Sequence, residues 1–199
     1  MYKKPIRLIQ SFALSLLLIV STPVFSQAIL TKVGSSFPMF NGADLSAWTK
    51  IGNASWQIDS KELSVTQGGG MLVSRLSVPD YIIEFDYWVS DSAQASIYFR
   101  CTNPNAINTG TAYEVPLVNK ANGIGAGSIW LLSKAKPNQV ANQWNHMQIS
   151  AIGNQVSVSL NGVVSQVTDT RFSAGAIAMN YQAGELRLKN INVTIPGRW

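Results

Sequence analysis

Apolar and polar residues alternate along most of the chain from residue 54 onward. A period of two residues is typical of β-strands with one buried face, whereas an amphipathic helix repeats every three to four residues. Clusters of Gly, Asn, Asp, Ser and Pro separate the alternating runs, as turns do. The pattern predicts no long helix, and it predicts strands at Ser55–Ile58, Glu62–Thr66, Met71–Ser74, Tyr81–Val89, Ala95–Arg100, Ala112–Val118, Ser128–Leu132, Trp144–Ile152, Gln155–Leu160, Val163–Thr168, Gly175–Asn180 and Glu185–Ile195.

Two dipeptides predict a meander near the C-terminal end. Gly153-Asn154 joins two alternating runs, and Asn161-Gly162 joins the next two with the dipeptide that type I′ turns favour. The chain has 199 residues, enough for one domain after a leader is removed. Many short antiparallel strands without an internal repeat indicate an all-β fold, a two-sheet antiparallel β-sandwich or jelly roll.

Alternation also predicts which side chains share a sheet face. Asp86 and Trp88 point away from the apolar positions of their strand, Tyr98 and Arg100 do so in the next strand, and Glu114 does so in the strand after it. A sheet face that bears charges and aromatic rings together is a candidate ligand surface.

The N-terminal segment predicts export. Lys3, Lys4 and Arg7 precede an apolar run over residues 12–20, and small residues follow near position 26. This order is typical of a cleaved signal peptide. Serines and a proline interrupt the run, which disfavours the alternative of a retained membrane anchor. We therefore expect a signal peptide at 1–26, a linker at 27–36, a domain at 37–199, and a periplasmic or secreted protein without membrane association.

Composition narrows the function classes. Residues 1–26 hold three of the 15 cations and none of the 10 anions, so the formal net charge of the remainder is +2, with no basic run for nucleic acid. Cys101, the single cysteine, is predicted to be a small buried apolar residue, and His146, the single histidine, a surface or hydrogen-bonding residue. No zinc-ligand spacing and no cofactor motif is present, while calcium held by loop carbonyls and Asp side chains stays open.

Motifs in a definite order suggest a family. The stretches are Phe40-Asn41-Gly42-Ala43-Asp44-Leu45-Ser46-Ala47-Trp48, Ser96-Ile97-Tyr98-Phe99-Arg100, Tyr113-Glu114-Val115, Gly127-Ser128-Ile129-Trp130, Gln143-Trp144-Asn145, Leu160-Asn161-Gly162 and Lys189-Asn190-Ile191. Together they resemble the 3-keto-disaccharide hydrolase family, over roughly residues 37 to 195. The resemblance implies a concanavalin A-like jelly roll that acts on glycosides whose C3 hydroxyl has been oxidised to a ketone.

That chemistry makes defined demands on a site. A ketone at C3 acidifies the proton on C2, so that a base removes it, the enolate expels the C1 substituent, and water adds to the unsaturated sugar. The site needs a base, a positive group beside the C3 oxygen and an acid for the leaving group. By its resemblance to the family, Glu114 is the expected base and Arg100 its partner or a partner of the anionic oxygen. Asp86, on the polar face of its strand, is expected to be the second carboxylate or to orient Arg100.

The expected substrate is an oxidised glycoside. We expect aromatic and amide side chains to contact it. Pyranose C–H groups pack on flat rings. The candidates are Trp88, Tyr98, Trp130, Asn119 and Gln182, whereas Trp48, Trp56 and Trp144 lie within apolar alternation and are predicted to be core.

Three positions differ from the family's usual pattern. Pro116 and Asn119 stand where the family usually has Gln and Asp, and residues 179–184 lack the His-Gly common near the C-terminus. A noncatalytic carbohydrate-binding domain that uses the same concave face is therefore the alternative to an enzyme. A structural envelope protein without a ligand is a third.

Overall fold

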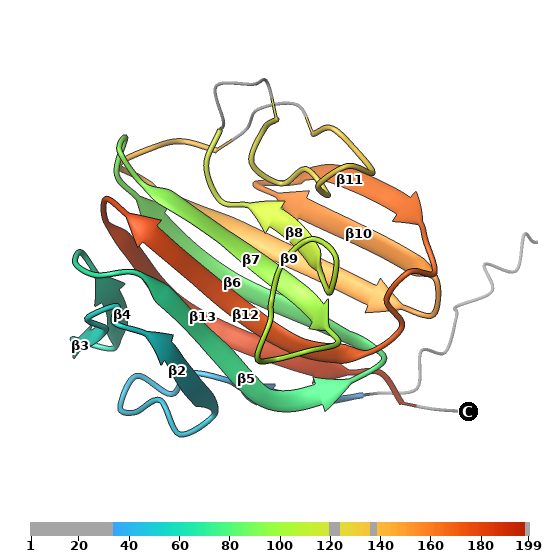
Figure 1. The fold of residues 1–199 in the computed structure, drawn as a ribbon, viewed down its shortest axis with the longest axis horizontal. Coiled ribbons are helices and arrows are strands. Elements are labelled where there is room, and N and C mark those ends of the chain that lie inside the picture. Colours follow the sequence, from blue (N-terminus) through green and yellow to red (C-terminus); the bar gives the residue numbers. More distant parts are fainter. Residues whose placement is uncertain (1–33, 120–123, 136–138, 198–199) are drawn as a thin grey trace, which may run out of the picture. The chain divides into compact units, whose positions relative to one another are not determined.

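The described part of the chain is built from strands that form two antiparallel sheets (Figure 1). The computed structural model describes residues 34–119, 124–135 and 139–197. The expected signal peptide, 1–26, and residues 27–33 of the expected linker lie outside the described residues. The described part contains no helix of the length and hydropathy needed to span a membrane.

The larger sheet has eight strands. Their order is β11-β10-β9-β6-β13-β4-β3, and β1 pairs with the end of β13. The strands are β1 (Ser35–Pro38), β3 (Gln57–Asp59), β4 (Glu62–Val65), β6 (Tyr81–Val89), β9 (Trp144–Ile152), β10 (Gln155–Leu160), β11 (Val163–Thr168) and β13 (Leu186–Ile195).

The smaller sheet has five strands and lies in front of the larger one in Figure 1. Their order is β2-β5-β12-β7-β8, so that β12 is the middle strand. The strands are β2 (Trp48–Gly52), β5 (Gly70–Val78), β7 (Gln94–Cys101), β8 (Tyr113–Pro116) and β12 (Gly175–Ala183).

The core lies between the sheets and follows from the alternation. In β6, every odd-numbered residue from Tyr81 to Val89 is fully buried and every even-numbered one is half-buried on the outer face. Ile97 and Phe99 of β7 and Met179 of β12 meet this layer from the smaller sheet. Burial of these apolar side chains is the dominant favourable contribution to folding. The predicted two-sheet antiparallel sandwich is confirmed.

The predicted hairpins also form. β9 and β10 pair from Ile152 to Gln155, and β10 and β11 pair from Leu160 to Val163. Asn161 and Gly162 both have positive φ angles, 47° and 84°, as a type I′ turn requires.

One predicted strand and one predicted core residue are wrong. The stretch Ser128–Leu132 is a turn, because the amides of Leu132 and Ser133 both donate to the carbonyl of Ile129, and Leu131 has a φ of 64°. Trp144 lies on the outer face of the larger sheet and is 36% exposed. Trp48, Trp56 and Cys101 are buried as predicted.

The outer face of the smaller sheet is partly covered. The connection between β7 and β8, residues 102–112, folds back over it, the yellow-green loop in front of β12 in Figure 1. Ile107 of this loop packs against Val73 and Ala178, which point outward from β5 and β12. The loop leaves hollows on either side of β12, and one of them holds Glu114.

The buried tyrosines make the folded protein less stable at alkaline pH. Burial raises the pKa of Tyr81, Tyr87 and Tyr181 above the ordinary value near 10. Below pH 10 both the folded and the unfolded chain keep these protons, whereas above it only the unfolded chain releases them. We therefore expect the free energy of unfolding to fall as the pH rises above 10. Phenolate absorbance should appear together with loss of the near-ultraviolet circular dichroism, and phenolate formed at pH 10 in the intact fold would contradict this.

Candidate functional site

Two rows of side chains cross the outer face of the smaller sheet. Strand pairing sets each row, because residues paired across antiparallel strands point to the same side. In the first row Glu114 pairs with Tyr98, Tyr98 with Ala178, and Ala178 with Val73. The second row runs parallel to it and consists of Pro116, Ser96, Asn180, Met71 and Ile51.

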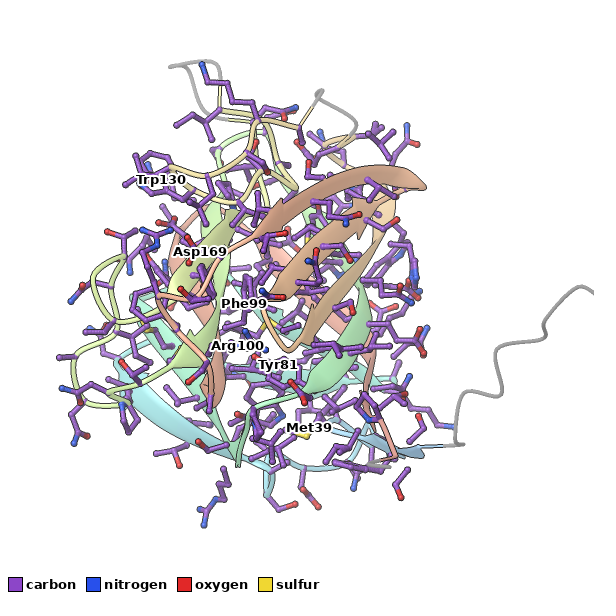
Figure 2. All side chains as sticks on the ribbon, turned by 90° about the vertical axis from the view of Figure 1, so that its right-hand side faces the viewer. Met39, Tyr81, Phe99, Arg100, Trp130 and Asp169 are labelled. Atoms are coloured by element: carbon purple, nitrogen blue, oxygen red, sulfur yellow. The ribbon has the colours of Figure 1, made fainter. Side chains whose placement is uncertain are left out.

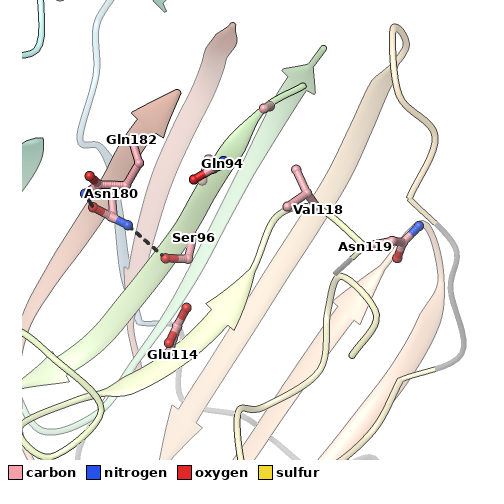
Figure 3. Close-up of a pocket in the computed structure, with 9 residues that line it drawn as sticks. Gln94, Ser96, Glu114, Val118, Asn119, Asn180 and Gln182 are labelled. Atoms are coloured by element: carbon pink, nitrogen blue, oxygen red, sulfur yellow. Dashed lines mark hydrogen bonds between the residues drawn. The ribbon is translucent and has the colours of Figure 1, made fainter. Parts of the chain in front are cut away.

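A cavity of about 350 Å³ opens over these rows on the β7 and β8 side of β12. We call it the Glu114 pocket. Figure 3 shows the polar side chains that line it from β7, β8 and β12. Its lining consists of Ala93, Gln94, Ala95, Ser96, Glu114, Val118, Asn119, Asn180 and Gln182. Glu114 is the one ionisable side chain among these lining residues.

A chain of hydrogen bonds leads from the rim of the pocket to Glu114. The Gln182 amide donates to Asn180 Oδ1 over 2.8 Å, and the Asn180 amide donates to Ser96 Oγ over 3.2 Å (Figure 3). Ser96 and Tyr98 are hydrogen-bonded, and the Tyr98 hydroxyl donates to the Glu114 carboxylate. Glu114 is only 7% exposed. A carboxylate at this depth needs such donors, because burial without them is costly.

The environment keeps Tyr98 protonated. Burial and the negative charge of Glu114 raise the pKa of Tyr98 to about 12. At neutral pH its hydroxyl is therefore a proton donor and not a phenolate. The carboxylate of the pocket, an acceptor, is thus paired with the neutral hydroxyl of the neighbouring Tyr98, a donor.

Two further expected residues, Asn119 and Trp130, lie in the connection between β8 and β9, and of the two only Asn119 lines the pocket. Asn119 lines the pocket and accepts a hydrogen bond from the amide of Ala126 over 3.0 Å. This bond joins two parts of the connection between β8 and β9. The amide of Trp130 donates to the carbonyl of Glu114 over 2.9 Å. The Trp130 side chain points outward on the side of the smaller sheet in Figure 2. The structure therefore pairs Tyr98 with Glu114, brings Asn119 and Gln182 into the lining of the same pocket, and joins Trp130 to Glu114 through the backbone.

Arg100 does not join them, because a β-bulge turns it inward. Phe99 and Arg100 of β7 lie opposite the single residue Ile177 of β12, and Arg100 has a φ of 50°. A bulge of this kind reverses the alternation that follows it. The expectation that Arg100 shares the face of Tyr98 and Glu114 is therefore wrong.

The Arg100 guanidinium instead holds the corner between the sheets together. It is 1% exposed, and Figure 2 shows it beside Tyr81 between the sheets. Nε donates to the carbonyl of Pro79 and Nη1 to that of Phe172, both over 3.1 Å, while Nη2 lies 3.5 Å from Asp80. These contacts join β7 to two connections that precede β6 and β12.

Asp86 and Trp88 lie on the opposite side of the molecule from Glu114. Both project from the outer face of β6, which belongs to the larger sheet. Asp86 is hydrogen-bonded to His146 Nδ1 over 2.8 Å and accepts from Asn190 over 2.7 Å. The guanidinium of Arg187 lies 5.7 Å from the centre of the Trp88 ring. The sequence pattern identified Asp86 and Trp88 correctly as outward-facing residues. It did not show that β6 and β8 belong to different sheets.

Ser96, Asn180 and Gln94 are pocket residues that sequence reasoning did not select. Alternation did place Ser96 on the face of Tyr98. Asn180 was detectable as a polar residue within an apolar run from Ala176 to Tyr181. A buried polar side chain in the middle strand of a sheet is informative, because such positions are usually apolar.

The described residues contain no group of three or more His, Cys, Asp or Glu side chains that could hold a metal ion. The chemical capacity of the pocket, as far as the described residues show it, lies in one buried carboxylate, one protonated phenol and several amides.

A family profile decides the family. The profile described as "3-keto-alpha-glucoside-1,2-lyase-like domain" matches residues 36–194. The chain belongs to this family. The sequence motifs resembled members of this same family, so the predicted membership is confirmed. Among curated proteins, none matches the chain in sequence.

Solved structures share the fold of this family member. A candidate glycosyl hydrolase from Parabacteroides distasonis is 14% identical, with 82% of this chain and 94% of that one covered and a TM-score of 0.71. The carbohydrate-binding module CBM66 from Bacillus subtilis is 19% identical, with 73% and 94% covered and a TM-score of 0.58. The Bacillus licheniformis β-glucanase is 16% identical, with 83% and 99% covered and a TM-score of 0.57. The fold is the predicted concanavalin A-like jelly roll.

The position of Arg100 predicts a structural contribution. Replacing it in Arg100→Met leaves the carbonyls of Pro79 and Phe172 without these donors and should lower the free energy of unfolding by about 3 kcal/mol. Urea unfolding measures this difference. Arg75→Met, at an exposed position, is the control and should change it by less than about 0.5 kcal/mol. Equal changes in the free energy of unfolding for the two substitutions would contradict a stabilising role of the buried Arg100 side chain.

Proposed function

We propose that this family member cleaves the glycosidic bond of 3-keto-glycosides in the Glu114 pocket, with Glu114 as the base. The observation that carries the proposal is a buried carboxylate, hydrogen-bonded to a protonated tyrosine, in a cavity on the outer face of the smaller sheet. The family description names lyase chemistry on a 3-keto-glucoside, which requires such a base.

The proposed reaction begins at C2 of the sugar. Glu114 takes the C2 proton, and the electrons of the C2–H bond form the enolate with the C3 carbonyl. When the ketone re-forms, a C1–C2 double bond forms and the bond from C1 to the leaving oxygen breaks. The leaving oxygen takes a proton, and water addition to the unsaturated sugar then gives the free 3-keto-sugar.

We assign Tyr98 as the acid that protonates the leaving oxygen. Its pKa of about 12 keeps the hydroxyl protonated at neutral pH, so that it has a proton to donate. Its hydrogen bond to Glu114 places donor and base side by side, the arrangement that a syn elimination across adjacent carbons uses. Glu114 and Tyr98 also pair directly across β8 and β7, so the sheet fixes their spacing.

The remaining lining suits recognition of a sugar. Gln94, Asn119, Asn180 and Gln182 offer amide donors and acceptors, and sugar hydroxyls need both. These groups alone also suit binding without chemistry, which favours a noncatalytic carbohydrate-binding domain as the second candidate. Both candidates use the same pocket. We further propose that the chain acts outside the cytoplasm, in the periplasm or secreted, after cleavage of residues 1–26.

The decisive variant is Glu114→Gln. Gln cannot accept the C2 proton but keeps the size of the side chain, so release of the 3-keto-sugar from a 3-keto-disaccharide should fall at least a hundredfold. A time course by proton NMR measures this release, with and without added calcium. Sugar binding, followed by ligand-induced shifts, should persist in the variant.

Glu84→Gln is the matched control. Glu84 is a half-buried carboxylate on the outer face of the larger sheet, and its replacement should leave turnover unchanged. Equal turnover by the wild type and Glu114→Gln would reject Glu114 as the base. Binding without any release by the wild type would establish the binding domain instead.

A further inference from the structure

A second hollow lies on the same outer face, on the other side of β12. Its volume is about 270 Å³. We call it the Met71 groove. Its walls are the tip of the 102–112 loop and the facing ends of β2 and β5, and the side chains that shape it are Ile51, Met71, Pro104, Asn105, Ile107 and Gln182.

The Met71 groove continues the Glu114 pocket. Gln182 lines both hollows. The row of Ser96, Asn180, Met71 and Ile51 also crosses from one to the other, one residue on each strand. Three strand spacings separate the ends of this row, about 14 Å at ~4.8 Å each. This span suits a sugar ring in the Glu114 pocket that carries a second ring on its C1 oxygen.

The two hollows differ in chemistry. Six of the nine residues that line the Glu114 pocket have polar side chains, whereas five of the nine that line the Met71 groove, Ala106 included, have apolar ones and only Asn105 and Gln182 have polar ones. Ile51 is 40% exposed, although it is a large apolar residue. Among the side chains that line this groove, only Asn105 and Gln182 could pair with the hydroxyls of a second sugar. An apolar ring would instead cover Ile51 and Met71 and remove apolar surface from water.

The loop wall of the groove is held in place by contacts within the chain. Thr102 N donates to the carbonyl of Thr111 over 2.9 Å, and Thr111 Oγ1 donates to the carbonyl of Ala106 over 2.7 Å. Ile107 is anchored on Val73 and Ala178. A wall fixed in advance lowers the entropic cost of binding.

We propose that the Met71 groove binds the leaving group of the substrate, and that this leaving group is an apolar, ring-shaped aglycone. The inference rests on the proposed function, because it takes the reacting sugar to lie in the Glu114 pocket. The substrate class is thus a 3-keto-glycoside of an aryl alcohol in preference to a 3-keto-disaccharide.

The test compares two substrates on each protein. The kcat/KM for a phenyl 3-keto-glucoside is divided by that for a 3-keto-disaccharide of the same anomeric configuration. Because both substrates are used on every variant, differences in leaving-group reactivity cancel. In Ile51→Asn and Ile107→Asn the quotient should fall about tenfold, the size of one apolar contact in discrimination. The control Val164→Asn, at a 60% exposed position on β11, should leave it unchanged.

A binding measurement keeps this inference separate from the proposed function. Unoxidised phenyl glucoside has no acidified C2 proton, so it should shift the methyl NMR signals of Ile51, Met71 and Ile107 without reacting, whereas methyl glucoside should not. An unchanged quotient in both groove variants, or the same methyl shifts with both glucosides, would overturn the groove assignment. Methyl shifts with phenyl glucoside but no turnover of either keto-substrate would reject the proposed chemistry and leave the groove as an aryl-glycoside binding site.

Discussion

The pairing of β12 with β5 on one edge and β7 on the other is the constraint on which the site depends. From Gly175 to Tyr181 every residue of β12 is buried, because one side faces the core and the other is covered by the 102–112 loop. Such a strand cannot slip by one residue without exchanging its two faces. Its register therefore places Asn180 between Ser96 and Met71, and with them the two hollows.

The same register explains how a carboxylate can be buried at the site. Glu114 lies at the end of a series of donors that crosses from Gln182 through Asn180, Ser96 and Tyr98. Each of these side chains occupies an outward position of a neighbouring strand, so the series exists only while the strands keep their pairing. The electrostatics of the pocket are thus a property of the sheet and not of one loop.

Most of the fold could be predicted from local pattern. β6, β9, β10 and β11 have their predicted bounds because each alternates strictly and ends at a clear turn signal. Alternation fails where backbone geometry changes within a strand. The bulge at Arg100 and the turn at residues 129–133 both involve a positive φ at a residue other than glycine, which short-range sequence does not reveal. The assignment of strands to sheets failed for Asp86 and Trp88 because it depends on long-range pairing.

The inward turn of Arg100 also changes how the site must work. A guanidinium beside Glu114 would stabilise both the carboxylate and a developing enolate, but this one is committed to carbonyl groups between the sheets. With Arg100 committed elsewhere, the Tyr98 hydroxyl and the Ser96 and Asn180 side chains are polar groups that share the outer face of the smaller sheet with Glu114. The proposed elimination therefore relies on groups other than Arg100 to stabilise the developing enolate, and the amide side chains that line the pocket are donors of the required kind.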